Sequence, residues 1–438
     1  MAKDDSVDLV TSAFFRFMKV GSLFGKVGFS LVGNKMLNMF MGKESREKRI
    51  IENFIKNGDR IFDALGKLKG GVMKIGQMLS LQEGLLPPEV MKFLRMLQKE
   101  APAIEFSQME KVLENEIPHY KNKTKSLDKN PYASASIGQV HTAVLNDETK
   151  VAIKIQYPNV DKAIKADLKN LKILFKLLIS IFSKANFDPI WQELEERLLE
   201  EIDYTIELKN QMYFKKIFVA SSILQIANPV EDLCSHKVLT TTFIAGDNLD
   251  YVVENYSQQQ KNIIGENLIK IFLEQLFGNN VVHADPNAGN YAFTKDGKVI
   301  LYDFGCVKYL PYHIVTTYAL IVNEFYNKRY KEIPRILQKI ELQTVANEPI
   351  KEKIVETFYD FFHQIFLDDH YQFGLDNKLF EKLKDVGRQH FGDSLEIQVP
   401  KDIIFLHRSF EGLFGNLSRL KSKANFGILV QQAIQERI

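Results

Sequence analysis

Three polar residues in the second half of the chain have the types and spacing of a site that handles phosphate with a metal ion. Asp285 and Asn290 lie five residues apart in the segment HADPNAGN, and Asp303 follows thirteen residues later in DFG, after the apolar run VILY. Hard divalent cations prefer oxygen ligands. Asn290 and Asp303 are therefore candidate metal ligands, and Asp285 is a candidate catalytic base.

The same order of residues occurs in protein kinases, whose catalytic loop H-R-D-L-x-x-x-N is followed by D-F-G. There the loop Asp receives a hydroxyl proton, while the Asn and the second Asp hold magnesium. Lys154, in VAIK, lies 131 residues before Asp285 and matches the strand lysine that holds the α- and β-phosphates of ATP. Together these patterns predict ATP and Mg²⁺ as cofactors. Two unrelated aspartate loops would not explain their order.

The lysine needs an acidic partner, and the predicted helical stretch from about Val160 to Phe218 offers Glu201 and Glu207. On one continuous helix, residues six apart lie about 120° apart around the axis. One carboxylate can therefore face Lys154 while the other meets a different partner. Charge alone does not decide which one does so, and both could also belong to a solvated acidic face.

Periodicity predicts an α+β protein with a helical start, a small β-rich part and a large helical part. Hairpin strands are expected at Val140–Leu145 and Val151–Ile155, joined by an Asn-Asp turn, and a further strand at Val238–Ile244. The lysine-rich segment Tyr120–Lys129 is expected to be a linker. Two short strands are expected around Tyr291–Thr294 and Val299–Tyr302, among helices. The predicted domains are a helical extension (1–119), an N-lobe (120–246) and a helical C-lobe (247–438).

Composition excludes several classes of protein. The 438 residues carry a formal charge of +2, which gives no basis for a nucleic-acid partner. Two cysteines in so long a chain indicate neither a disulfide framework nor a zinc site, and they suit a reducing compartment. The N-terminus lacks the pattern of a signal peptide, and no apolar run reaches about 18 residues. We therefore expect a cytoplasmic protein without a transmembrane helix.

Residues 9–43 differ from the rest of the chain. They contain five basic residues and no acidic one, with apolar side chains and glycines between them. One interpretation is a helix that packs on the fold. The other is a segment at a membrane surface, where basic residues face anionic lipid and apolar residues enter the interface.

Further motifs resemble the UbiB family of atypical kinase-like proteins, also called AarF. They are K-x-G-Q (Lys74 to Gln77), an alanine-rich loop that ends in SIGQVH, and E-x-D (Glu201 and Asp203), in the family's order with VAIK, HADPNAGN and DFG. The resemblance spans about Lys67 to Lys308, and residues 406–420 look similar too. Its implied cofactor-binding residues are Gln77, Ala133, Ser134, Ala135, Ser136, Gly138, Gln139, Lys154, Glu201 and Glu207, with Lys74, Lys154 and Asp285 catalytic.

The resemblance implies a two-lobed kinase-like fold whose N-terminal extension covers the active site. Lys74 would pair with Glu201 or Asp203, and Lys154 with Glu207. It also implies an ATPase or atypical kinase that supports the biosynthesis of ubiquinone or another isoprenoid lipid. Expected partners are ATP, a lipid-like or quinone-precursor molecule, lipid-biosynthesis proteins, and a membrane surface through residues 9–43.

The sequence departs from kinase patterns in four places. The family's alanine run contains Ser134, which puts nucleotide preference in doubt, and Asn287 stands where protein kinases often have a lysine. The strand with Thr240, Thr241 and Thr242 lacks the acidic residue often found at the adenine hinge. No A-P-E follows Gly305, so the segment that would cradle a peptide is too short.

These departures argue against an orthodox protein kinase. Two other functions stay open. One is a small-molecule phosphotransferase, because the H-x-D-x-x-x-x-N spacing also resembles aminoglycoside and choline kinases. The other is a non-catalytic nucleotide-binding scaffold, although the complete set of catalytic residues counts against it.

Overall fold

The computed structural model describes residues 104–435 and 437 with gaps at 136, 163, 166–167, 169–171, 173–186, 345, 368–370 and 375–396. Two compact units divide the chain. The described part of the first unit comprises residues 104–205 and Val230–Thr241, and the second comprises Ile206–Pro229 and the described residues from Thr242 onward. Residues 1–103 of the predicted N-terminal extension, including Lys74, Gln77 and residues 9–43, lie outside the described residues.

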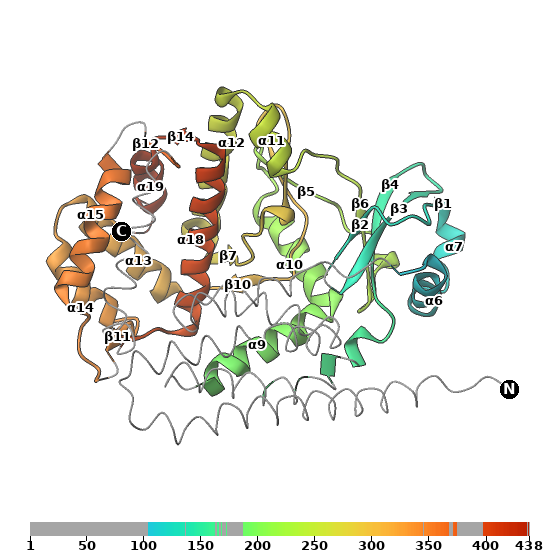
Figure 1. Cartoon of the computed structure of the whole chain (residues 1–438), viewed down its shortest axis with the longest axis horizontal. Coiled ribbons are helices and arrows are strands. Elements are labelled where there is room, and N and C mark those ends of the chain that lie inside the picture. Colours follow the sequence, from blue (N-terminus) through green and yellow to red (C-terminus); the bar gives the residue numbers. More distant parts are fainter. Residues whose placement is uncertain are drawn as a thin grey trace, which may run out of the picture. The chain divides into compact units, whose positions relative to one another are not determined.

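A five-stranded sheet forms the centre of the first unit, with strand order β1-β3-β4-β6 and the short β2 beside β3 (Figure 1). Alternate residues of β4, among them Val151, Ile153 and Ile155, are buried, as expected for a strand with one face in the core. The elements are α6 (Phe106–Glu116), α7 (Tyr120–Lys123), β1 (Thr124–Leu127), β2 (Ala133–Ser134), β3 (Gly138–Leu145), β4 (Lys150–Gln156), α9 (Phe187–Glu201), η2 (Glu231–Leu233) and β6 (Val238–Thr242).

The predicted hairpin is confirmed, because β3 and β4 pair antiparallel around residues 146–149. The prediction of a linker at Tyr120–Lys129 is wrong. Tyr120 is buried and donates a hydrogen bond to Glu110 at 3.0 Å, and β1 pairs antiparallel with β3. The lysines that suggested a linker instead lie on or beside an edge strand, where charged side chains oppose pairing with a second chain.

The predicted continuous helix to Phe218 is also wrong, because α9 ends at Glu201 and α10 (Tyr204–Ile217) begins after a break. Asp203 explains the break. Its Oδ1 accepts hydrogen bonds from the Thr205 backbone amide at 3.0 Å and the Thr205 hydroxyl at 2.7 Å, which satisfies donors at the start of a helix. Glu201 and Glu207 are thus on different helices, and the 120° separation predicted for them does not apply.

The second unit is mainly helical, with short strand pairs that carry the candidate site. Strands β8 and β9 confirm the two short strands predicted from the sequence. The elements after α10 are β5 (Leu224–Ile226), α11 (Leu249–Asn255), α12 (Gln258–Leu273), η3 (Glu274–Gly278), β7 (Val281–His283), η4 (Ala288–Asn290), β8 (Tyr291–Phe293), β9 (Val299–Leu301), β10 (Val307–Tyr309), α13 (Tyr312–Tyr326), η5 (Tyr330–Glu332), α14 (Ile333–Gln338), β11 (Gln343–Thr344), α15 (Glu352–Leu367), β12 (Tyr371–Gln372), β13 (Ile397–Gln398), α18 (Lys401–Leu420), β14 (Lys423–Ala424) and α19 (Phe426–Ile434).

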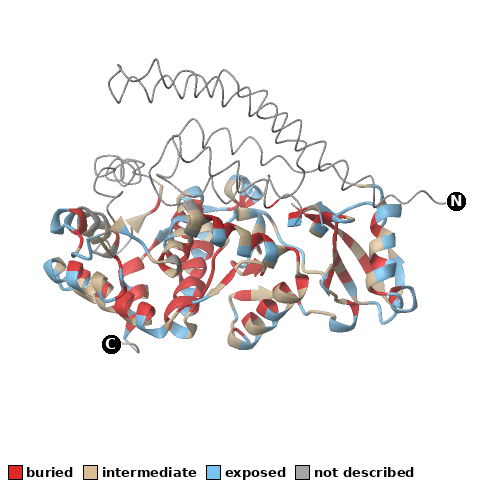
Figure 2. Ribbon diagram, turned by 90° about the horizontal axis from the view of Figure 1, so that it is seen from below, coloured by how far each residue is buried: buried red, intermediate tan, exposed pale blue. Residues whose placement is uncertain are grey.

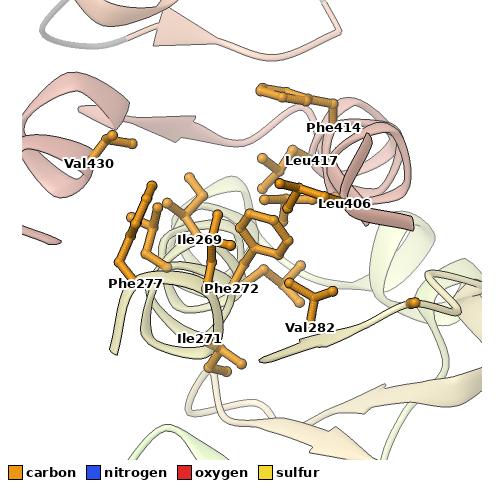
Figure 3. Packing of buried hydrophobic residues seen from close by; sticks show 14 of the residues in the cluster. Ile269, Ile271, Phe272, Phe277, Val282, Leu406, Phe414, Leu417 and Val430 are labelled. Atoms are coloured by element: carbon orange, nitrogen blue, oxygen red, sulfur yellow. The ribbon is translucent and has the colours of Figure 1, made fainter. Parts of the chain in front are cut away.

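Helix α12 is the central helix of this core. Ser257 and Gln260 form a reciprocal capping box that fixes its first turn. Ile269 and Phe272 face residues of α18, among them Leu406 and Leu417 (Figure 3). Strands β7 and β9 are buried along their whole length, and Figure 2 colours all such buried residues red. The loops that follow these two strands therefore leave from rigid supports.

Candidate functional site

The loop after β7 brings Asp285 and Asn290 together. The side-chain amide of Asn290 donates a hydrogen bond to the backbone carbonyl of Asp285 at 3.2 Å. Asn287 closes the loop further. Its backbone carbonyl accepts from the backbone amide of Asn290 at 2.9 Å, and its side-chain Oδ1 accepts from the backbone amide of Gly289 at 3.0 Å. Because the side-chain nitrogen of Asn290 is bound to the Asp285 carbonyl, its Oδ1 can act as a hydrogen-bond acceptor or metal ligand.

Asp303 follows β9 and is joined directly to this loop. The backbone amide of Tyr302 donates to the carbonyl of Asn290 at 3.0 Å, and Nε2 of His283 lies 2.6 Å from the carbonyl oxygen of Asp303. The Asp303 carboxylate accepts from the amide of Gly305 at 2.9 Å. Hydrogen bonds thus connect both segments that carry the predicted metal ligands.

Phe304, between Asp303 and Gly305, is fully buried and is held by α10. Its backbone amide donates to Oε1 of Glu207 at 3.4 Å, and its carbonyl accepts from Nδ2 of Asn210 at 2.9 Å. Its ring packs edge-on against Phe214 with centroids 5.3 Å apart. Residues three and four apart on a helix share a face, so Glu207 and Asn210 hold the same peptide from one side of α10. The predicted pairing of Glu207 with Lys154 stays a prediction.

The residues present fit a magnesium ion that takes some of its ligands from the protein and the rest from the substrate and water. Mg²⁺ is usually bound by one or two carboxylates, water and substrate phosphates instead of an all-protein cage. Asp303 supplies a carboxylate and Asn290 an amide oxygen. The described residues contain no cluster of three or more His, Cys, Asp or Glu side chains suited to a metal. This donor set is the sparse one that a nucleotide-bound magnesium requires.

Arg408, on α18, is a site residue that the sequence did not single out. Its Nη2 lies 3.4 Å from Oδ1 of Asp285, and the side chains are only 18% and 14% exposed. Burial raises the pKa of Tyr291 well above its ordinary range, and the negative charge of Asp285 adds to this shift. The only sequence signal for Arg408 was the resemblance of residues 406–420 to the family, which gave it no role.

In the first unit, Lys154 lies on β4 opposite Val140 of β3. Its Nζ is 4.9 Å from the centre of the Tyr204 ring. A cation at this distance over an aromatic face is attracted by the ring. Tyr204 therefore restrains the lysine that the sequence assigns to phosphate binding.

The alanine-rich loop begins on the same hairpin. Ala133 and Ser134 form β2 and pair with Val140 and Gln139, and the Ala135 amide donates to the carbonyl of Gly138 at 2.8 Å. A side chain at Gly138 would collide with the backbone of Ile155, so strand packing alone requires glycine there. Ser136 lies outside the described residues.

Gln139, which is predicted to contact the nucleotide, has a fully buried side chain that is bound within its own unit. Its amide oxygen accepts from the Ile104 backbone amide and its nitrogen donates to the Ile104 carbonyl, both at 3.1 Å. The nitrogen also lies 3.0 Å from Nε2 of His141, whose Nδ1 donates to the carbonyl of Asp128 at 2.9 Å. These bonds, which we call the Gln139 clamp, support a structural role for Gln139.

Comparison with known proteins agrees with this architecture. Residues 96–337, more than half of the chain, match the family model described as the ABC1 atypical kinase-like domain. The chain is 28% identical over 393 residues to the probable serine/threonine-protein kinase abkA of Dictyostelium discoideum, which covers 84% of this chain and 69% of the relative. It is 27% identical to the atypical kinase COQ8, mitochondrial, of Saccharomyces cerevisiae, over 99% of this chain and 87% of that protein.

Coverage differs among the relatives. The chain spans 48% of the length of the rat atypical kinase COQ8B, mitochondrial, with 36% identity over 252 residues. The solved complex of Rv3197 with erythromycin from Mycobacterium tuberculosis shares the fold, with a TM-score of 0.63 and 24% identity over 88% of this chain and 98% of that one. No helix among the described residues is long and apolar enough to cross a membrane. The chain belongs to the ABC1 atypical kinase-like family and has the mixed helix-and-sheet, kinase-like fold predicted from its sequence.

Proposed function

We propose that this protein is a Mg-ATP-dependent atypical kinase-like ATPase that supports the biosynthesis of a quinone or another isoprenoid lipid. The observation that carries the proposal is the hydrogen-bonded assembly of Asp285, Asn290 and Asp303. Family membership supports it, as do relatives in rat and yeast named atypical kinases COQ8B and COQ8.

Each residue has a distinct part in this proposal. Asn290 and Asp303 would hold Mg²⁺, which would neutralise charge on the phosphates. Lys154 contacts the α- and β-phosphates, and Tyr204 limits its motion. Asp285 orients the attacking hydroxyl or water and accepts its proton. Lys74, Gln77 and the alanine-rich loop are proposed to complete nucleotide binding.

The segment after Gly305 argues against a polypeptide substrate. Residues Val307–Tyr309 form β10, which pairs with β7, and α13 begins at Tyr312. Only Leu310 and Pro311 separate the strand from the helix, so this stretch has no room for an extended peptide platform. A small or lipid-like acceptor, or water, is the substrate that we propose.

We also propose that the protein works peripherally at a membrane through residues 9–43. The test is ATP hydrolysis with and without anionic vesicles or a phenolic, quinone-like compound, with Asp285→Asn as the inactive control. Slow hydrolysis that either addition increases supports the proposal. A phosphorylated metabolite without hydrolysis would favour a small-molecule kinase, and nucleotide binding without turnover would favour a scaffold.

A further inference from the structure

Helix α18 runs beside β7 and contacts the catalytic loop along one face (Figure 1). Ser409 Oγ lies 3.2 Å from the carbonyl oxygen of His283 and 2.9 Å from that of Phe405, so the two carbonyls share its one hydroxyl hydrogen, and Asn416 Nδ2 donates to the carbonyl of Pro286 at 3.4 Å. Arg408, one residue before Ser409, pairs with the Asp285 side chain. Residues on two turns of α18, at 408–409 and at 416, thus contact residues 283, 285 and 286, and all of α18 lies outside the family-matched segment 96–337.

Gly412 shows how closely the helix and the loop approach. A Cβ atom at this position would collide with the ring of Pro286. Gly415, three residues later on the same helix, would meet nothing within 4 Å. Glycine inside a helix is destabilising compared with alanine. Glycine is therefore required at position 412, where it lets the loop lie directly against the helix, but no such contact requires it at position 415.

The helix is itself rigidly held, so it can act as a template. Phe410 packs against Phe272 of α12 with ring centroids 4.8 Å apart, and Leu406 and Leu417 are fully buried in the same core (Figure 3). The Arg408–Asp285 pair is largely withdrawn from solvent, whereas Arg419 on the same helix pairs with Asp250 where the side chains are 44% and 80% exposed. Exposed pairs contribute little, so only the first is expected to restrain its partner.

We propose that α18 is the template of the catalytic loop and that Arg408 is a positioning residue that orients the Asp285 carboxylate. This inference rests on the proposed function, because it concerns the same aspartate. A guanidinium presents its donors in a fixed planar fork, and Nη2 of Arg408, 3.4 Å from Oδ1 of Asp285, restrains the position of that carboxylate oxygen. Small displacements of a catalytic group of about 1 Å can lower a rate by about 100-fold.

The first test compares Arg408→Ala with Arg419→Ala. Hydrogen exchange of residues 284–291 is expected to accelerate only in Arg408→Ala, and kcat for Mg-ATP hydrolysis is expected to fall about 10- to 100-fold with KM within about twofold. Arg408→Lys should retain part of kcat, and added guanidinium ion at millimolar concentration should restore part of it to Arg408→Ala. A purely structural defect would not respond to guanidinium.

The second test compares Gly412→Ala with Gly415→Ala. The first variant should lower kcat and speed exchange in the loop, whereas the second should leave both unchanged with an equal or higher unfolding temperature. Equal behaviour of the two alanine variants would overturn the template.

The readouts separate failure of the inference from failure of the proposed function. If wild type hydrolyses ATP but Arg408→Ala keeps full kcat, the positioning role is wrong and the proposed function stands. If wild type does not hydrolyse ATP, the proposed function is wrong and the catalytic role of Arg408 falls with it. Unchanged exchange of residues 284–291 in Arg408→Ala overturns the template in either case.

Discussion

The ring nitrogen Nε2 of His283 lies 2.6 Å from the carbonyl oxygen of Asp303. A carbonyl can only accept a hydrogen bond, so this nitrogen carries the hydrogen and donates it. The first residue of the catalytic loop therefore holds the backbone of the predicted metal ligand. His283 is also buried, so its ring has little access to water that could replace this bond.

Replacing His283 with alanine should consequently weaken Mg-ATP binding and lower the unfolding temperature. An acceptor left unsatisfied by the loss of a buried hydrogen-bond partner costs about 1–3 kcal/mol. Calorimetric titration and thermal unfolding measure the two effects. His313→Ala, which removes an exposed histidine on α13, is the control. Wild-type affinity and stability in His283→Ala would show that the bond is dispensable.

Asp303→Asn should abolish magnesium-dependent nucleotide binding because it removes the charged metal ligand. Substitution of a residue that hydrogen-bonds to a metal ligand typically lowers metal affinity by about 10–100-fold. Loss of the ligand itself should therefore lower the affinity for Mg-ATP by more than about 100-fold. Titration with Mg-ATP measures the loss. Asp296→Asn changes an exposed aspartate on the turn before β9 and should bind like wild type. An unchanged affinity for Mg-ATP in Asp303→Asn contradicts the metal assignment.

The Gln139 clamp should make the first unit sensitive to acid. Burial lowers the pKa of His141 below its ordinary value of about 6.5. At a pH between this lowered pKa and about 6.5, His141 binds a proton in the unfolded chain but not in the native protein. The free energy of unfolding therefore falls as the pH drops through this window. Protonation would also set Nε2–H against the Gln139 amide donor.

Thermal unfolding at about pH 7.5 and pH 5.5 tests this expectation. The decrease in unfolding temperature on acidification should be smaller in His141→Gln than in wild type, because the linked proton is removed. His119→Gln, at an exposed site in the same unit, should retain the wild-type decrease. An equal decrease in all three proteins would exclude His141 as the linked group.

Ala133→Gly should loosen the nucleotide loop and change the preference between ATP and ADP. Ala133 is on β2, which is only two residues long, so only a short pairing with β3 restrains this backbone. Glycine adds conformational freedom worth about 0.5–1 kcal/mol, or a factor of about 2–5 in affinity. The ratio of the two nucleotide affinities measures the effect, and the same ratio in wild type and variant would argue against this loop as the nucleotide loop.

Features encoded by short-range spacing could be predicted from the sequence. Asp285, Asn290 and Asp303 lie within nineteen residues, and two short apolar runs joined by an Asn-Asp turn indicate the β3–β4 hairpin. The break between Glu201 and Glu207 was missed because apolar periodicity continues across it, although Asp203 before Thr205 is a helix-start signal. The lysine-rich β1 was missed because an edge strand can carry the composition of a linker.

Contacts between distant segments could not be predicted in the same way. Arg408 is 123 residues from Asp285, and Asn210 is 94 residues from its partner Phe304. No local pattern relates such residues, since the packing of the core alone brings them together. Gln139 is also held by such a distant contact, because its side chain is bound to Ile104, 35 residues away, and the nucleotide contact suggested by its motif stays a prediction.

The most direct test of the central claim is Mg-ATP turnover by wild type and Asp285→Asn, each with anionic phosphatidylglycerol vesicles, with neutral phosphatidylcholine vesicles, and without lipid. Wild type is expected to hydrolyse ATP slowly and faster on anionic vesicles, while Asp285→Asn binds Mg-ATP without turning it over. Equal turnover by the two proteins, or vigorous phosphorylation of peptides by wild type with no response to lipid, would contradict the proposal.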